Sequence, residues 1–389
     1  MKLDEFSLAQ GGLIYALQKR ITLAATGQTG VVQQSLVFVS ITWAPLLILS
    51  LVQGVALGTR VDIPFLRDFL VNVRFLVALP ILIVAAIFID PSVRHAVNHF
   101  VTSELVPSEE MARFEDVITK TMKLRDSAIA TTLLVATAFA PSLWPGLVDF
   151  ATPGMSSWHF APQGEDTLSL AGWWFLLISI PVYRVLLLHW FWLMIVWATL
   201  LWRISKIELR CIPSHPDGAG GLDFLAHTQR KFAIVGMAAS AIIAGGIANS
   251  IAYHGRPLSD YKYLIPAVCA LLVIGIAAPV LVMRPQLLRV KRKGLLEYGV
   301  LGSAYAGSFQ NKWVNEPPLK SESLLGTADI QSLADLAGSY EVVRDMRTIL
   351  IDMKAFLRMA LVILLPTVPL LLVIAPAEDI LKLILKILG

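Results

Sequence analysis

Six long, mainly apolar stretches constrain the fold more than any other feature of this sequence. A helix needs about 20 such residues to cross the hydrocarbon core of a bilayer. The stretches are 35–57, 72–90, 127–149, 172–202, 232–254 and 263–284, and a seventh candidate, 357–376, contains Pro366 and Pro369. Only 15% of the residues are charged, against about 25% in soluble domains. The sequence predicts an all-α fold, a polytopic transmembrane helix bundle of about seven spans with cytoplasmic amphipathic helices.

Basic residues predict how the chain is oriented. Most of the 32 Lys and Arg residues lie in four segments outside the spans, 1–34, 91–126, 203–231 and 285–356. Connections rich in Lys and Arg stay in the cytoplasm. The amino terminus is therefore predicted to be cytoplasmic. The carboxyl terminus lies on the opposite side if the seventh stretch crosses, and on the same side if its two prolines make it re-enter.

The last cytoplasmic segment carries a helical pattern of apolar residues from Ile330 to Met353. No Pro or Gly interrupts it after Gly338. One interpretation is a single rod that continues into the last span. The other is a surface helix that packs on the neighbouring cytoplasmic loops.

Arg184 lies near the middle of the fourth span, with Tyr183 and His189 beside it. A charged residue at this depth costs about 2.5–3.5 kcal/mol on insertion scales, so it faces protein or water. No Asp or Glu is placed deep in a predicted span. Arg184 is either an anion-binding or pore-lining residue, or it bonds backbone carbonyls or the headgroup of an anionic lipid.

The fifth span is rich in small residues, which let helices approach closely in lipid. It also contains Ser240, Asn249 and Ser250. One interpretation is helix packing alone. The other is that these three polar residues line a narrow aqueous path beside Arg184.

The most unusual loop contains His215, Pro216 and Asp217, followed by Gly218, Ala219, Gly220 and Gly221. Glycines permit tight turns whose backbone N–H groups can hold a phosphate. The string matches neither the dinucleotide-binding nor the phosphate-loop pattern. The alternatives are a phosphate site at His215, Asp217, Gly220 and Gly221, and a tight connection between two spans.

This loop and the string GTADIQSLADLAGSYEVVRDMR near the carboxyl end resemble uncharacterised multi-pass integral membrane proteins of bacteria, over most of the chain. No activity is assigned to that group. The resemblance implies a bacterial inner (plasma) membrane, with the carboxyl terminus in the periplasm if seven spans cross, and it transfers no functional residues.

Catalytic and metal sites find little support in the sequence. His95 and His99 have chelating spacing, and Cys211, His215 and Asp217 form a second partial set, but neither supplies four convincing ligands. No cofactor, metal or catalytic residue is predicted. The net charge of +4 is modest and gives no reason to expect nucleic-acid binding.

Three functional hypotheses follow. The first is a channel or transporter, a homo-oligomer in the lipid bilayer that passes an anion or small solute. The second is a membrane sensor or scaffold that acts through its cytoplasmic loops. The third is a lipid-modifying or redox membrane enzyme, although an enzyme is the less favoured class.

Overall fold

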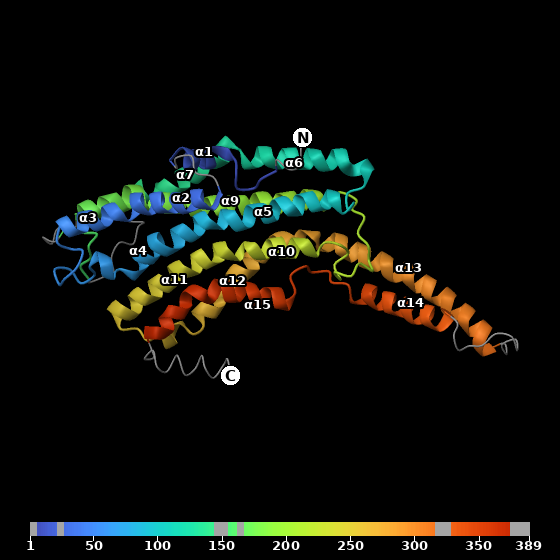
Figure 1. Ribbon diagram of the computed structural model, residues 1–389. Coiled ribbons are helices and arrows are strands. Elements are labelled where there is room, and N and C mark those ends of the chain that lie inside the picture. Colours follow the sequence, from blue (N-terminus) through green and yellow to red (C-terminus); the bar gives the residue numbers. More distant parts are fainter. Residues whose placement is uncertain (1–5, 22–26, 144–154, 162–166, 316–327, 374–389) are drawn as a thin grey trace.

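Among the described residues, seven helices are long and apolar enough to cross a membrane (Figure 1). The computed structural model describes residues 6–21, 27–143, 155–161, 167–315 and 328–373. The seven helices are Gly30–Val52, Phe69–Thr102, Ser108–Leu143, Leu170–Ile204, Asp223–His254, Leu258–Asn315 and Met353–Leu371. Each overlaps one predicted span, so the predicted all-α membrane bundle is confirmed. The membrane boundaries stay predictions, and residues 144–149 and 374–376 of two predicted spans lie outside the described part, as do 1–5, 22–26 and 316–327.

The long helices are assembled from shorter elements. The amino-terminal half contains α1 (Gly12–Ile21), α2 (Gly27–Thr42), α3 (Ala44–Val52), α4 (Phe69–Val73), α5 (Leu79–Thr102), α6 (Met111–Arg125) and α7 (Ala128–Leu143). The remainder contains α8 (Leu170–Trp174), α9 (Ile180–Ile204), α10 (Asp223–Lys231), α11 (Ala233–His254), α12 (Leu264–Ala277), α13 (Arg284–Gln310), α14 (Ala328–Asp345) and α15 (Met353–Leu364). A 3-10 segment, Leu365–Val373, follows α15 and contains both prolines of the seventh predicted span.

Prolines set where two of the long helices change their winding. Pro80 and Pro181 stand in the first turns of α5 and α9, and each helix is preceded by a π-helical turn, Arg74–Ala78 and Phe175–Ser179. Proline has no N–H and its ring crowds the carbonyl four residues earlier. A wider turn before the ring accommodates this defect, so the helix continues through it.

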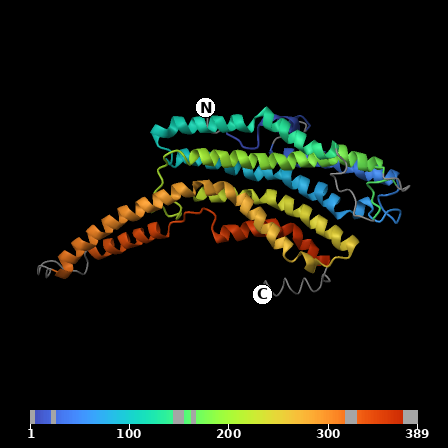
Figure 2. The same ribbon diagram turned by 180° about the vertical axis from the view of Figure 1, so that it is seen from behind.

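The helices lie lengthwise beside one another, and α13 and α14 project together beyond one end of the others (Figures 1 and 2). We call this pair the projecting hairpin and that end of the bundle the hairpin end. The two helices pack on each other along their length. The opposite end carries the turns around residues 55–68, 155–161 and 167–169 and is called the loop end.

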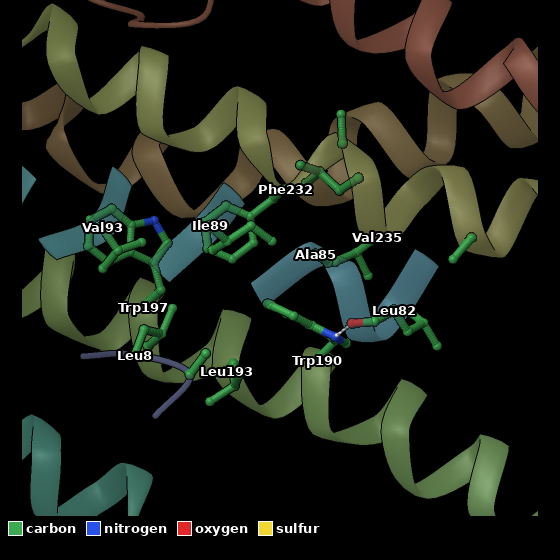
Figure 3. Packing of buried hydrophobic residues seen from close by; sticks show 14 of the residues in the cluster. Leu8, Leu82, Ala85, Ile89, Val93, Trp190, Leu193, Trp197, Phe232 and Val235 are labelled. Atoms are coloured by element: carbon green, nitrogen blue, oxygen red, sulfur yellow. Dashed lines mark hydrogen bonds between the residues drawn. The ribbon is translucent and has the colours of Figure 1, made fainter. Parts of the chain in front are cut away.

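In the described part of the bundle, most of the interior is filled by a large cluster of buried apolar side chains, and a second, smaller cluster contains Ala244, Ile247 and Leu370. Figure 3 shows the centre of the large cluster, where α5, α9 and the start of α11 meet. The indole of Trp190 donates a hydrogen bond to the Leu82 carbonyl at 2.7 Å, and that of Trp197 donates to Gln229 Oε1 at 2.9 Å. These bonds satisfy the two donors that the large buried rings bring into the core.

Two buried carboxylates lie on the helix formed by α4 and α5, one at its start and the other within α5. Asp68 caps α4 at the loop end and is 4% exposed, and Asp90 is 2% exposed near the hairpin end. At 1.5 Å per residue they are separated by about 33 Å, close to the thickness of a bilayer's hydrocarbon core. The apolar pattern of the sequence marks neither residue, although Asp90 ends the second predicted span.

Asp90 holds the amino-terminal segment against the bundle. Its Oδ1 accepts hydrogen bonds from Ser7 Oγ at 2.7 Å, from the backbone N–H of Leu8 at 2.7 Å and from that of Ala9 at 2.9 Å. Its Oδ2 pairs with Arg94 at 3.2 Å. Leu8 is thereby fixed in the apolar core (Figure 3).

The interpretation of residues 330–353 as one rod was wrong. The helix α14 ends at Asp345 and α15 begins at Met353, so residues 346–352 are not helical. Asp352 caps α15 by accepting from the Ala355 N–H at 2.7 Å, and the Arg347 N–H bonds the Gly218 carbonyl at 2.7 Å. Tertiary hydrogen bonds thus replace the helical bonds that the apolar pattern alone predicted, and α14 turns onto α13.

Gly172 permits a close backbone contact at the loop end. A Cβ atom there would overlap the carbonyl oxygen of His159 and lie 3.1 Å from its carbonyl carbon. We expect Gly172→Ala to lower the free energy of unfolding by about 1–3 kcal/mol, because overpacking forces the backbone to move. Scanning fluorimetry should show a lowered melting temperature, whereas Gly246→Ala, where a Cβ meets open space, should not show one.

Candidate functional site

The His-Pro-Asp loop and the carboxyl-terminal string, far apart in sequence, meet at the base of the projecting hairpin. We call residues 211–223 and 346–352 together the hairpin joint. Gly218, Gly220 and Gly221 have φ values of +62°, +65° and +92°. This left-handed region suits glycine. The glycines therefore let the loop fold back on Asp217, which precedes them.

Asp217 is the centre of the joint. Its Oδ1 accepts from the N–H groups of Ala219 at 2.8 Å and Gly221 at 3.1 Å, and lies 2.9 Å from His215 Nδ1. Its Oδ2 accepts from the Asp223 N–H at 3.1 Å. Burial alone raises the pKa of Asp217, but these backbone and side-chain hydrogen bonds outweigh it and leave the pKa below its ordinary value.

Arg347 fastens this loop to the hairpin. Its Nη2 donates to the Asp217 carbonyl at 2.8 Å and to Asp223 Oδ1 at 2.8 Å. Its Nη1 lies 3.8 Å from Asp352 Oδ2. One guanidinium therefore links the loop, the start of α10 and the cap of α15.

Contacts from α13 complete the joint. Lys291 Nζ donates to the Met346 carbonyl at 2.9 Å, and the hydroxyls of Ser214 and Tyr298 are 2.7 Å apart. A Cβ atom on Gly294 would lie 2.5 Å from Pro213 Cβ, so only glycine permits this approach. The hairpin is thus held at its base by polar bonds from three segments of the chain.

The hydrogen bonds described for this loop hold it closed around Asp217. The N–H groups of Ala219, Gly221 and Asp223 donate to the chain's own carboxylate, Asp217. The phosphate site suggested by the sequence stays a prediction. His215 pairs with the same carboxylate, and Gly220 and Gly221 shape the turn. Among the residues that the structure describes, no group of three or more His, Cys, Asp or Glu side chains is placed to hold a metal ion.

Cys211 reports on the state of the joint. Burial and the nearby Asp217 charge raise the pKa of its thiol to about 12. Because the thiolate is the reactive form, we expect iodoacetamide at pH 9 to alkylate Cys211 at least about 100-fold more slowly in the folded protein than in denaturant, as a pKa difference of roughly three units requires. Mass spectrometry of a Cys269→Ser variant measures both rates. Equal rates would contradict the burial.

Arg184, Tyr183 and His189 lie on α9, where Arg184 and His189 are half-buried. Among the described residues, Arg184 Nη1 and His189 Nδ1 are buried without a hydrogen-bond partner. Tyr183 is buried, and the Arg74 guanidinium lies 5.8 Å from the centre of its ring. The role of these residues in anion binding or in lining a pore stays a prediction.

The polar residues of the fifth span bond to other partners. Asn249 accepts from the Phe69 N–H at 2.8 Å and donates to Asp68 Oδ1 at 2.9 Å, while Ser250 Oγ accepts from Tyr261 at 2.6 Å. Ser240 is buried in α11. Both α9 and α11 pack against α5. The path beside Arg184 likewise stays a prediction.

Sequence reasoning missed the two buried carboxylates and the role of Arg347. Asp68 receives hydrogen bonds from Trp158 Nε1 at 3.0 Å as well as from Asn249. An acidic residue bordering an apolar stretch was the signal available for Asp68 and Asp90. No local pattern marks Arg347, because the two partners to which its side chain donates hydrogen bonds lie 124 and 130 residues away.

Comparison of the chain with protein-family models, with curated proteins and with solved structures finds no match. The resemblance to bacterial membrane proteins therefore stays a prediction. Helix length and hydropathy identify the chain as a multi-pass α-helical membrane protein.

Proposed function

We propose that the protein is a membrane-embedded scaffold that acts through its projecting hairpin. The observation that carries the proposal is the hairpin joint, in which Arg347 fixes the base of two helices that extend beyond the bundle. With the predicted orientation, the hairpin lies in the cytoplasm. A projecting hairpin whose base is fixed in this way presents the same surface to other proteins at all times.

The surface of the hairpin supports this function. Leu296 and Val300 on α13 are 73% and 72% exposed. Fully burying such side chains contributes about 1.5–3 kcal/mol each, so they favour a protein contact. In the described part of the bundle, in contrast, most of the buried side chains are apolar and form one large cluster. The scaffold hypothesis therefore gains more from these residues than the channel hypothesis does.

A photo-crosslinking amino acid at Leu296, used in living cells, tests the scaffold. We expect one discrete adduct, identified by mass spectrometry, that weakens when Arg347→Ala is added. The matched control places the same amino acid at Leu361, which is 70% exposed on α15 within a spanning helix. Absence of any protein adduct at Leu296 would overturn the proposal.

The conduit hypothesis rests on a different observation, the buried and unpartnered Nη1 of Arg184 within the described bundle. Ion flux into proteoliposomes, in chloride and in gluconate, tests it. Chloride-selective flux that Arg184→Leu abolishes and Arg358→Leu preserves would support a conduit. The scaffold function predicts no flux above that of empty liposomes.

A further inference from the structure

The outer face of α13, opposite α14, is basic and apolar. The residues that meet the neighbouring segments include Lys291, Gly294 and Gly299. With 3.6 residues per turn, the opposite side carries six residues that are all exposed. These are Arg289, Arg292, Lys293, Leu296, Glu297 and Val300, and Lys293 pairs with Glu297 at 3.7 Å.

The outer face of α14 is acidic and has little side-chain bulk. It contains five exposed residues, Ala334, Gly338, Glu341, Val342 and Asp345. A Cβ atom at Gly338 would meet nothing within 4 Å, so the face is open there. Arg344 pairs with Glu341 at 3.4 Å and with Asp345 at 3.2 Å. These exposed ion pairs are weak and can exchange partners.

The two outer faces match in height along the hairpin. Gly294 lies against Val343, and Gly299 is nearest Tyr340. Because the helices are antiparallel, these contacts place Lys293 level with Asp345, Leu296 with Val342 and Val300 with Gly338. At these levels the basic Lys293 matches the acidic Asp345, and the large side chain of Val300 matches Gly338, which has no side chain.

We propose that the α13 outer face of one copy packs on the α14 outer face of the next. Copies that span the same bilayer in the same orientation have their hairpins at the same height. Residues that are level within one hairpin are therefore also level between neighbouring copies. The contact is head-to-tail, and such contacts close into rings when the rotation permits. Pairing α13 with α13 is disfavoured because it would bring Arg289, Arg292 and Lys293 against their own copies. This inference rests on the proposed function, because it takes the hairpin as the interacting element and names a second copy of the chain as its partner.

Disulfide trapping tests the register. Val300→Cys and Gly338→Cys, together in a Cys211→Ser, Cys269→Ser chain, should give a ladder of covalent oligomers upon mild oxidation in membranes. The ladder should stop at one size, the number of copies in the ring, and either cysteine alone should give at most a dimer. As a mismatched control, Val300→Cys with Gln331→Cys lies about 10 Å out of register, two turns of helix, and should give no ladder.

A substitution that spares the monomer provides the second measurement. Gly338→Leu projects into open space within one chain but would occupy the position that we assign to Val300 of the next copy. Light scattering in nanodiscs or detergent should show the mass falling to that of one copy. Gly302→Leu, where a Cβ also meets nothing within 4 Å, should keep the oligomer.

Failure of the ladder, an equal ladder from the mismatched pair, or an unchanged mass with Gly338→Leu would each overturn the pairing. An adduct between Leu296 and a different protein would then leave the scaffold function standing. Absence of any adduct at Leu296 would overturn both the scaffold function and the pairing of hairpins.

Discussion

Replacing Arg347 with alanine should raise the alkylation rate of Cys211 about 10- to 100-fold. The change removes bonds from a charged group to the Asp217 carbonyl and the Asp223 carboxylate. Hydrogen bonds to charged groups contribute about 1.5–3 kcal/mol, and each 1.4 kcal/mol is roughly a tenfold change in the equilibrium for opening. The rate is measured at pH 9 in a Cys269→Ser background.

Arg344→Ala is the matched control, because Arg344 lies three residues earlier and pairs within its own helix. It should leave the alkylation rate of Cys211 unchanged. If Arg347→Ala also leaves the rate unchanged, Arg347 does not hold the joint closed.

Replacing Asp90 with alanine should release the amino-terminal segment. The N–H groups of Leu8 and Ala9 lose their acceptor, and Arg94 loses its partner. A buried donor left unsatisfied costs about 1–3 kcal/mol. We therefore expect hydrogen exchange at the Leu8 and Ala9 amides to accelerate at least about tenfold, and the melting temperature to fall.

Asp116→Ala is the control for this change, because Asp116 is half exposed on α6 and pairs only with Lys120 among the contacts described. It should leave exchange at Leu8 and Ala9 as in the wild type. Unchanged exchange in Asp90→Ala would mean that apolar packing alone holds the segment.

The seven apolar helices could be predicted because length and hydropathy are local properties of the sequence. The hairpin joint could not, because its central bonds join Asp217 and Asp223 to Arg347 across more than a hundred residues. The same bonds explain why the apolar pattern from Ile330 to Met353 wrongly predicted one continuous helix. Apolar periodicity indicates which side of a helix is buried. It does not indicate whether a backbone N–H group bonds within the helix or to a distant part of the chain.

The polar residues of the candidate site were only partly predictable. The glycines after Asp217 predicted a tight loop, and their positive φ angles confirm it. The sequence left open whether the N–H groups of that loop bind phosphate, because the alternative acceptor is a side chain within the loop itself. The apolar pattern did not mark Asp68, which precedes the second predicted span, or Asp90, which ends it, because their hydrogen-bond partners lie far away in the sequence.

The most direct test of the central claim, that the joint fixes the hairpin on the bundle, is a distance measurement between the two. Spin labels at Val300→Cys on α13 and Ala112→Cys on α6, in chains without native cysteines and diluted with unlabelled copies in nanodiscs, report it by pulsed electron resonance. We predict one narrow distance distribution for the otherwise wild-type chain and a broad one when Arg347→Ala is added. A broad distribution in both, or the same narrow one in both, would contradict the claim.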